Sequence, residues 1–170
     1  VNIVERFINN SNSNNKFLKN IKIKDSKSLP ILIRKTYNEI DQNKWIIESN
    51  NSKKNINFSL LKNLEKLFTK GPVTPDHVIR IKSKPLIVKH NEINNIRNLI
   101  IKYTKDYRSY FKKNKKNIKS CKITDPLPRI IIIQGVGIIA TGKNNKEVKT
   151  SYDIFTSMSE SIIDSNKVGD

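Results

Sequence analysis

The 170-residue chain has little of the residue types that hold small proteins together through covalent bonds or metal ions. It contains one cysteine, Cys121, so it cannot form an internal disulfide bond. A secreted scaffold held by disulfides is therefore excluded, and a reducing cytoplasm fits this cysteine content. Two histidines, His77 and His90, and one cysteine leave no full set of four nitrogen and sulfur ligands for an ordinary zinc site.

Long apolar runs are also lacking. The longest run of strongly apolar residues is the four isoleucines at 130–133, far short of the roughly 18 residues that a membrane span needs. The sequence therefore predicts no transmembrane segment. Hydrophobic residues make up 36% of the chain, which is low for a globular domain but too much for a wholly disordered one.

Methionine occurs only at position 158, and the sequence begins with Val1. Residues 1–8 lack the order of basic and then apolar residues that is typical of a signal peptide. We expect a fragment, cut at both ends. It divides into an N-terminal part, 1–25, with the end of a helix and an Asn/Ser-rich linker, and a portion of one domain, 26–170.

Acidic residues are few. The 33 Lys and Arg residues outnumber 15 Asp and Glu residues, which gives a formal net charge of +18. Of the 33, 27 are Lys, and the chain also holds 23 Asn and 28 Ile residues, all of them encoded by AT-rich codons. Arg would be the more usual choice for phosphate or base contacts. Codon bias with a solvated surface, and a real polyanion-binding role, both stay open; either gives non-specific binding to nucleic acid through charge.

Hydrophobic spacing predicts alternating helices and strands, which is typical of an α/β domain. The expected helices are 28–40, 58–68, 92–114, and one capped by Asn144 or Asn145. The expected strands are 44–49, 85–89, 129–134 and 138–141. Tyr103, Tyr107 and Tyr110 are expected to face the core from the helix 92–114.

Residues 71–82 bring several chemically active side chains together between a helix and a strand. The candidate substrate-binding residues are Thr74, Asp76, His77, Arg80 and Lys82. Two cations suit a phosphate, and a carboxylate or imidazole suits hydroxyl groups or proton transfer. The alternative is a structural turn in which Asp76 caps a helical turn.

Residues 133–144 nearly match two nucleotide-binding patterns. Gly135, Gly137 and Ala140 satisfy G-x-G-x-x-A, but strand-like residues follow where a helix should begin. The G-x-x-x-x-G-K pattern ends at Lys143 and lacks the following Ser or Thr. A tight connection between two adjacent strands is the alternative that we favour.

Several segments resemble one family, and they do so in the same order and with similar gaps. They are GPVTPDHVIRIKSKPLIV (71–88), DPLPRIIIIQGVGIIATGKNNKEVKTSYDIF (125–155), LPILIRKTY (29–37) and TKDYRSYFKKN (104–114). They are similar to the bifunctional rhamnulose-1-phosphate aldolase/short-chain dehydrogenase proteins of the class II aldolase/adducin superfamily. The resemblance covers the later part of the aldolase region.

This resemblance implies an α/β/α sandwich of the class II aldolase/adducin type, here as a partial domain. It implies a lyase that splits a ketose 1-phosphate into dihydroxyacetone phosphate and an aldehyde, with a divalent metal, zinc, on the enediolate. A dehydrogenase domain that uses NAD normally follows. The partners would be a small sugar phosphate, the missing upstream and downstream parts, and a possible second copy.

Two departures from the family limit what this chain can do. The family's metal histidines lie in a segment that would precede Val1. Gln134 stands where a metal histidine is expected, and its amide is a poor zinc ligand. We therefore expect no metal and no catalysis by this chain alone, with Gln134, Gly135, Gly137 and Lys143 as secondary substrate-site candidates. The alternative function is a non-catalytic basic α/β module that binds a polyanion.

Two geometric expectations follow. The strands 129–134 and 138–141 should be neighbours joined through the glycine pair, with the last helix packed on their sheet. Asp76, His77 and Arg80 should converge on an exposed pocket, with Val78 and Ile79 turned inward as anchors.

Overall fold

A computed structural model describes residues 28–62, 64–69, 74–115, 123 and 125–167, without the side chains of 75, 76 and 162–167. The expected helix end and linker within 1–25 lie outside the described residues. The described elements are α3 (Leu29–Ile40), β1 (Ile46–Asn50), α4 (Lys53–Ser59), α5 (Leu64–Leu67), α6 (Pro75–Ile81), β2 (Leu86–Val88), the 3₁₀ helix η2 (His90–Asn95), α7 (Ile96–Asn114), β3 (Ile130–Ile133), β4 (Gly137–Gly142) and α8 (Asn145–Lys167).

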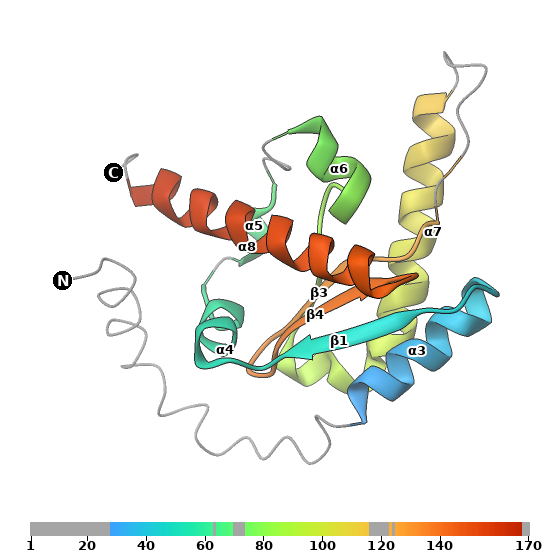
Figure 1. Cartoon of the computed structure of the whole chain (residues 1–170), viewed down its shortest axis with the longest axis horizontal. Coiled ribbons are helices and arrows are strands. Elements are labelled where there is room, and N and C mark those ends of the chain that lie inside the picture. Colours follow the sequence, from blue (N-terminus) through green and yellow to red (C-terminus); the bar gives the residue numbers. More distant parts are fainter. Residues whose placement is uncertain (1–27, 63, 70–73, 116–122, 124, 168–170) are drawn as a thin grey trace.

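One four-stranded sheet in the order β1-β4-β3-β2 forms the centre of the fold (Figure 1). β4 pairs antiparallel with both β1 and β3, whereas β2 runs parallel to β3. β2 and β3 therefore end at the same edge of the sheet, where the β3–β4 hairpin turns. The structure has the mixed α/β class that the alternation of elements predicts.

Helices cover both faces of this sheet, because its central strands are apolar on both sides. Ile131 and Ile133 belong to a core that includes residues of α3 and α7. Ile130 and Ile132 belong to a second core, with residues of α4, α5, α6 and α8. The alternation of side chains along β3 is what divides the four isoleucines between the two cores.

The expected strand pair is confirmed. Ile130 to Ile133 pair with Ala140 back to Gly137, and α8 packs on β4. Asn144 caps α8, since its Oδ1 accepts a hydrogen bond of 2.9 Å from the N–H of Glu147. Residues 137–142 form a strand rather than the start of a helix, so the two near-matches to nucleotide-binding patterns do not form the loop and helix that those sites require.

Two helix predictions were wrong in part. The segment 58–68 is not one helix, because α4 already ends at Ser59 and the short α5 follows. Residues 90–95 form a 3₁₀ helix before α7. Tyr110 was expected in the core, but it is 61% exposed, because the last turns of α7 extend beyond the body of the domain (Figure 1).

No helix among the described residues is long and apolar enough to cross a membrane.

The hairpin gives a test with a matched control. Gly137 has φ +128°, and a Cβ there would lie 2.6 Å from the backbone oxygen of Asn50. Gly135 has φ +78°, and a Cβ there would meet only Cδ2 of Leu60, at an ordinary contact distance of 4.0 Å. Gly137→Ala should therefore lower the free energy of unfolding by ~3 kcal/mol, and Gly135→Ala by only ~1 kcal/mol. Urea denaturation measures both. Equal losses would contradict the close approach of β1 to the hairpin.

Candidate functional site

A pocket of about 370 Å³ lies beside the hairpin end of the sheet. Its lining comes from the α4–α5 region, β2 and the hairpin: Ser59, Leu60, Leu61, Lys62, Leu64, Glu65, Lys66, Ile87, Lys89 and Gln134. Lys89 and Gln134 directly follow the parallel strands β2 and β3. Ligands of open α/β sheets typically bind beyond the carboxyl ends of such strands.

The rim of the pocket is mainly basic. Lys62, Lys66 and Lys89 are exposed there, against a single acidic residue, Glu65. The ammonium group of Lys89 lies 3.3 Å from Oε1 of Glu65. Both of these side chains are more than half exposed, so solvent weakens the pair and a stronger anion can displace it. The pocket therefore suits an anionic ligand.

Backbone contacts hold the polar wall of the pocket in place. The backbone N–H of Gln134 donates to the carbonyl of Val88 over 3.0 Å, and its side-chain Oε1 accepts from the N–H of His90 over 3.2 Å. The N–H of Gly135 donates to Oγ of Ser59 over 3.1 Å. These bonds tie the hairpin to both η2 and α4, on opposite sides of the turn.

The residues at this site do not fit a zinc ion. Among the residues that the structure describes, no group of three or more His, Cys, Asp or Glu side chains could hold a metal. The side-chain oxygen of Gln134 accepts a hydrogen bond from the backbone of η2. The prediction that the isolated chain binds no zinc stays a prediction.

The first candidate segment folds as the short helix α6, not as an open loop. Thr74 caps it, accepting from the N–H of His77 over 3.4 Å, and Pro75 occupies its first turn. Arg80 is exposed. None of the candidates Thr74, Asp76, His77, Arg80 and Lys82 lines the pocket at the hairpin. A role for them in substrate binding stays a prediction.

The expected anchors of this segment were wrong. Val78 is 37% exposed and Ile79 is 67% exposed, whereas Ile81 is only 3% exposed and packs in the core with α8. The prediction treated the segment as a loop, but a helix turns successive side chains by 100° and so selects one residue of the run for burial.

Lys82 points inward instead of toward an exposed pocket. It follows α6 with φ +67°, in the left-handed region, and its side chain is 1% exposed. Its ammonium group donates to the carbonyl oxygen of Asp125 over 2.6 Å and lies 4.7 Å from the centre of the Tyr107 ring. Burial lowers the pKa of Lys82 to about 8.

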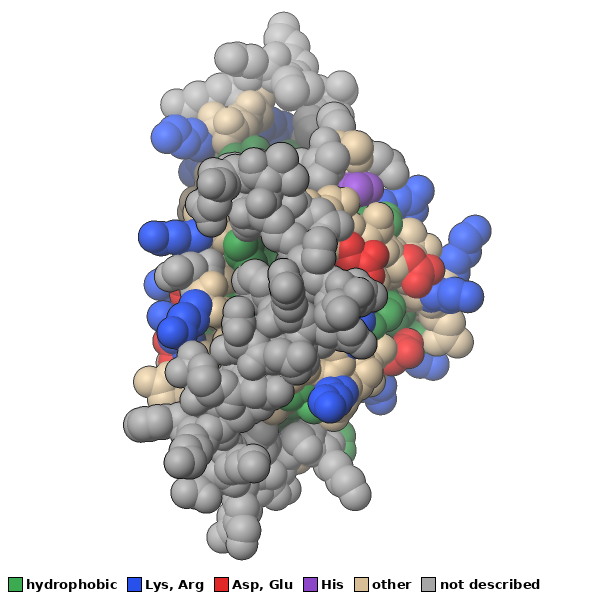
Figure 2. All heavy atoms as spheres, turned by 90° about the vertical axis from the view of Figure 1, so that its left-hand side faces the viewer, with side chains coloured by type: hydrophobic (Ala, Val, Ile, Leu, Met, Phe, Trp, Pro, Cys, Tyr) green, Lys and Arg blue, Asp and Glu red, His purple; other side chains and the backbone are tan. Residues whose placement is uncertain are grey.

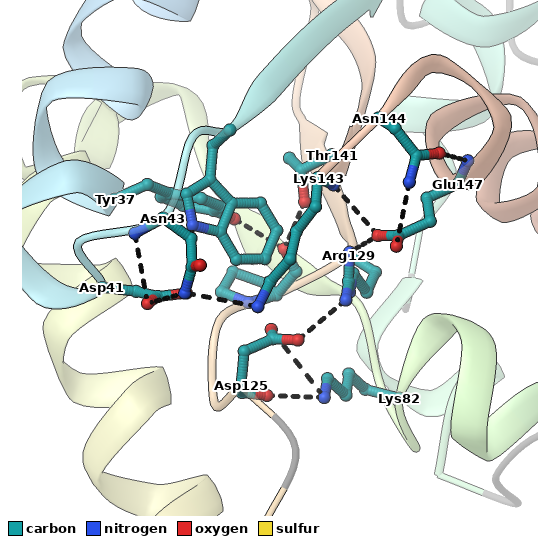
Figure 3. A network of polar contacts seen from close by, with 12 residues as sticks. Tyr37, Asp41, Asn43, Lys82, Asp125, Arg129, Thr141, Lys143, Asn144 and Glu147 are labelled. Carbon is teal, nitrogen blue, oxygen red and sulfur yellow. Dashed lines mark hydrogen bonds and ion pairs between the residues drawn. The ribbon is translucent and has the colours of Figure 1, made fainter.

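Lys82 belongs to a cluster of charged groups at the edge of the sheet opposite the hairpin (Figure 3). Arg129 lies at its centre, 2.7 Å from Oδ2 of Asp125 and 2.9 Å from Oε2 of Glu147. Glu147 also accepts from the backbone N–H of Lys143 over 2.9 Å. Although burial opposes it, these hydrogen bonds and the cations beside Glu147 lower its pKa.

The indole of Trp45 completes this cluster. Arg129 lies 4.9 Å and the Lys143 ammonium 5.7 Å from the centre of the indole ring, and the indole N–H donates to Asp41 over 3.2 Å. Lys143 lies 3.8 Å from Oδ2 of Asp41. Lys143 and Gln134, both secondary candidates from one sequence motif, therefore lie at opposite ends of β4. The structure brings Gln134 to the pocket and leaves Lys143 out of it.

Sequence reasoning missed all four charged residues that line the pocket. Lys62 and Lys66 lie four residues apart, after α4. Lys89 is the last residue of a segment that was expected to be a strand. A lysine directly after a strand was the one available signal, since the carboxyl ends of strands position ligands in α/β folds.

The buried position of Lys82 makes stability depend on pH. Between pH 8 and the usual lysine value near 10.4, the folded chain holds Lys82 neutral while the unfolded chain keeps it protonated. The unfolded state then binds more protons than the folded state. The contribution of Lys82 to the free energy of unfolding therefore rises with pH, by about 1.4 kcal/mol per pH unit. The free energy of unfolding of the wild type minus that of Lys82→Met, measured at several pH values, should rise with this slope. Lys84→Met, an exposed neighbour, is the control, and a flat difference for Lys82→Met would contradict the assignment.

Comparison with known proteins gives two matches. Residues 24–170 match the family model described as aldolase class II, second domain. Over 93 residues the chain is 29% identical to the "Uncharacterized oxidoreductase YuxG" of Bacillus subtilis (strain 168). This alignment covers 50% of the chain and 13% of that relative, so the chain spans a small part of its length. No solved structure matches the chain. Because the matched residues 24–170 make up most of the chain, the chain belongs to the aldolase class II second-domain family.

Proposed function

We propose that this chain provides the phosphate-binding pocket of a class II aldolase-like lyase that acts on a ketose 1-phosphate. The lyase would yield dihydroxyacetone phosphate and an aldehyde, as the rhamnulose-1-phosphate type does. The observation that carries this proposal is the lysine-rimmed pocket beyond the carboxyl ends of β2 and β3. Its place in the fold matches the usual ligand position, and its charge matches the substrate.

The three lysines suit the phosphate end of such a substrate. A sugar phosphate is a dianion, and ammonium groups form charge-assisted hydrogen bonds with phosphate oxygens. Lys89 is held next to the pocket by β2, and its exposed pair with Glu65 keeps its ammonium at the rim. The phosphate would replace Glu65 as the partner of Lys89.

The remaining wall suits the sugar end. Gln134 and Ser59 supply polar groups, while Leu60, Leu61 and Ile87 supply apolar surface. Small-molecule pockets commonly combine an apolar lining with a few fixed polar groups. Gln134 is fixed by its bonds to Val88 and His90, so it would orient a hydroxyl group of the substrate.

The chemistry at the reacting carbons needs further residues. The described residues do not fit zinc, so the divalent ion of such a lyase would be held by residues other than these. A dehydrogenase domain that uses NAD, a cytoplasmic location, a homo-oligomer and the α/β/α sandwich of the class II aldolase/adducin type are parts of the same proposal. In its support, the Bacillus subtilis relative is named an oxidoreductase and is far longer than its matched region.

Calorimetric titration with dihydroxyacetone phosphate tests the pocket. The chain should bind this ligand and should not bind neutral dihydroxyacetone. Lys89→Gln should weaken binding by ~1.5 kcal/mol, about tenfold, because it removes one charge-assisted hydrogen bond. Glu65→Gln should strengthen binding, because it removes the acid that competes for Lys89.

Two further variants separate the pocket from other positive charge. Lys149→Gln removes an exposed lysine of α8 and should leave the affinity unchanged. Arg80→Ala tests the earlier expectation that Arg80 binds the phosphate. If Arg80→Ala lost affinity and Lys89→Gln did not, the phosphate site would lie at α6 rather than at the hairpin. An equal loss of affinity in all the variants that remove a positive charge would mean that binding depends on the net charge alone.

Metal analysis of the purified, tag-free chain tests the absence of zinc ligands. We expect less than one zinc per chain and no cleavage of a sugar phosphate. Stoichiometric zinc in a monomer would contradict this expectation.

A further inference from the structure

Positive charge is concentrated on the second half of α7, away from the pocket. The helix carries Lys102, Lys105, Arg108, Lys112 and Lys113, all of them exposed. Asp106 is the one acidic residue of the whole helix. α7 packs on the face of the sheet opposite the α4–α5 side, so this surface is separate from the pocket.

The four lysines share the solvent face of α7. Lys102, Lys105 and Ser109 follow one another at three or four residues, and Lys112 and Lys113 lie three and four residues after Ser109. This spacing places the lysines on one side of the helix. The buried residues Ile96, Ile100 and Thr104 lie on the other side. From Lys102 to Lys113 the helix rises roughly 16 Å, which is long enough to run along several phosphates of a nucleic-acid strand.

These lysines differ from many other cations of the chain in their surroundings. Lys54, Lys89, Arg97, Arg129 and Lys143 each lie within 4.0 Å of an acidic group. None of the four α7 lysines forms such a pair with an acidic side chain in the described part of the chain. On the opposite side of the molecule, the visible described residues show Lys and Arg interspersed with Asp and Glu (Figure 2).

An aromatic ring lies beside this basic face. Tyr110 is 61% exposed and precedes Lys113 by three residues, so the two side chains are neighbours on the helix. An exposed ring next to cations is the arrangement on which unpaired bases stack while phosphates meet the ammonium groups. A duplex offers phosphates but keeps its bases paired.

We propose that the solvent face of α7 binds single-stranded nucleic acid, with Lys102, Lys105, Lys112 and Lys113 on the phosphates and Tyr110 against a base. This surface acts independently of the proposed lyase pocket. Binding is weak and salt-dependent, because exposed lysines act by releasing counterions rather than by reading bases.

Fluorescence anisotropy of the full 170-residue chain with labelled oligothymidylate tests the proposal. The α7 variant replaces Lys102, Lys105, Lys112 and Lys113 by Gln. A matched control replaces the exposed Lys35, Lys53, Lys146 and Lys149 by Gln, which removes the same charge from other helices. Gln keeps the helix propensity of Lys, and circular dichroism checks that both variants fold.

The α7 variant should lose at least tenfold in affinity, and its slope of log affinity against log salt should fall by about 3, from four lost phosphate contacts. The control should stay within about threefold of the wild type. Equal losses in both variants would overturn the proposal, because binding would then follow net charge alone.

Tyr110 tests the single-strand preference. Tyr110→Ala should weaken binding of oligothymidylate by roughly fivefold or more, whereas Tyr110→Phe keeps the ring and should bind like the wild type. Binding of a DNA duplex as tight as that of the single strand, or no effect of Tyr110→Ala, would overturn the proposal. The chain could also bind phosphatidylserine vesicles more tightly than oligothymidylate and lose this binding in the α7 variant. That result would assign the surface to membranes and would also overturn the proposal.

Discussion

The burial of β3 on both faces is the constraint on which the rest of the fold depends. Each of its four isoleucines is at most 1% exposed. Burial of one such side chain contributes ~1.5–3 kcal/mol, so neither face of the strand can be left to solvent. α3 and α7 must therefore cover one side while α4, α6 and α8 cover the other, and the chain crosses between the two sides of the sheet several times.

The same strand also decides where chemistry can take place. Its carboxyl end meets that of β2, and the turn that follows places Gln134 beside Lys89. Arg129 lies at its amino end, where it pairs with Asp125 and Glu147 in a mostly buried cluster. One end is left with surplus exposed cations and a pocket, and the other has its charges matched. An anion at the first end displaces only the solvent-exposed pair of Lys89 and Glu65, whereas an anion at the second end would have to break mostly buried ion pairs.

The hairpin and α8 could be predicted from the sequence, because a β-branched run, a close pair of glycines and an Asn cap are local signals. The pocket could not. Lys62, Lys89 and Gln134 come from three separate elements, and only the sheet order brings them together. Local signals also misled where two explanations competed: Thr74 and Pro75 mark a helix start, yet the polar residues after them suggested a binding loop. Tyr110 has the spacing of a core residue, but no sheet lies beneath the last turns of α7.

Trp45 has a consequence for how this protein can be observed. It is the only tryptophan in the sequence, it is 2% exposed, and the charged groups of Arg129 and Lys143 lie near its ring. Its fluorescence therefore arises from one place, in contact with the segments before β3 and after β4. Any change that separates these segments alters the polarity around a single indole, so intrinsic emission reports the closure of the charged end of the sheet without an added label.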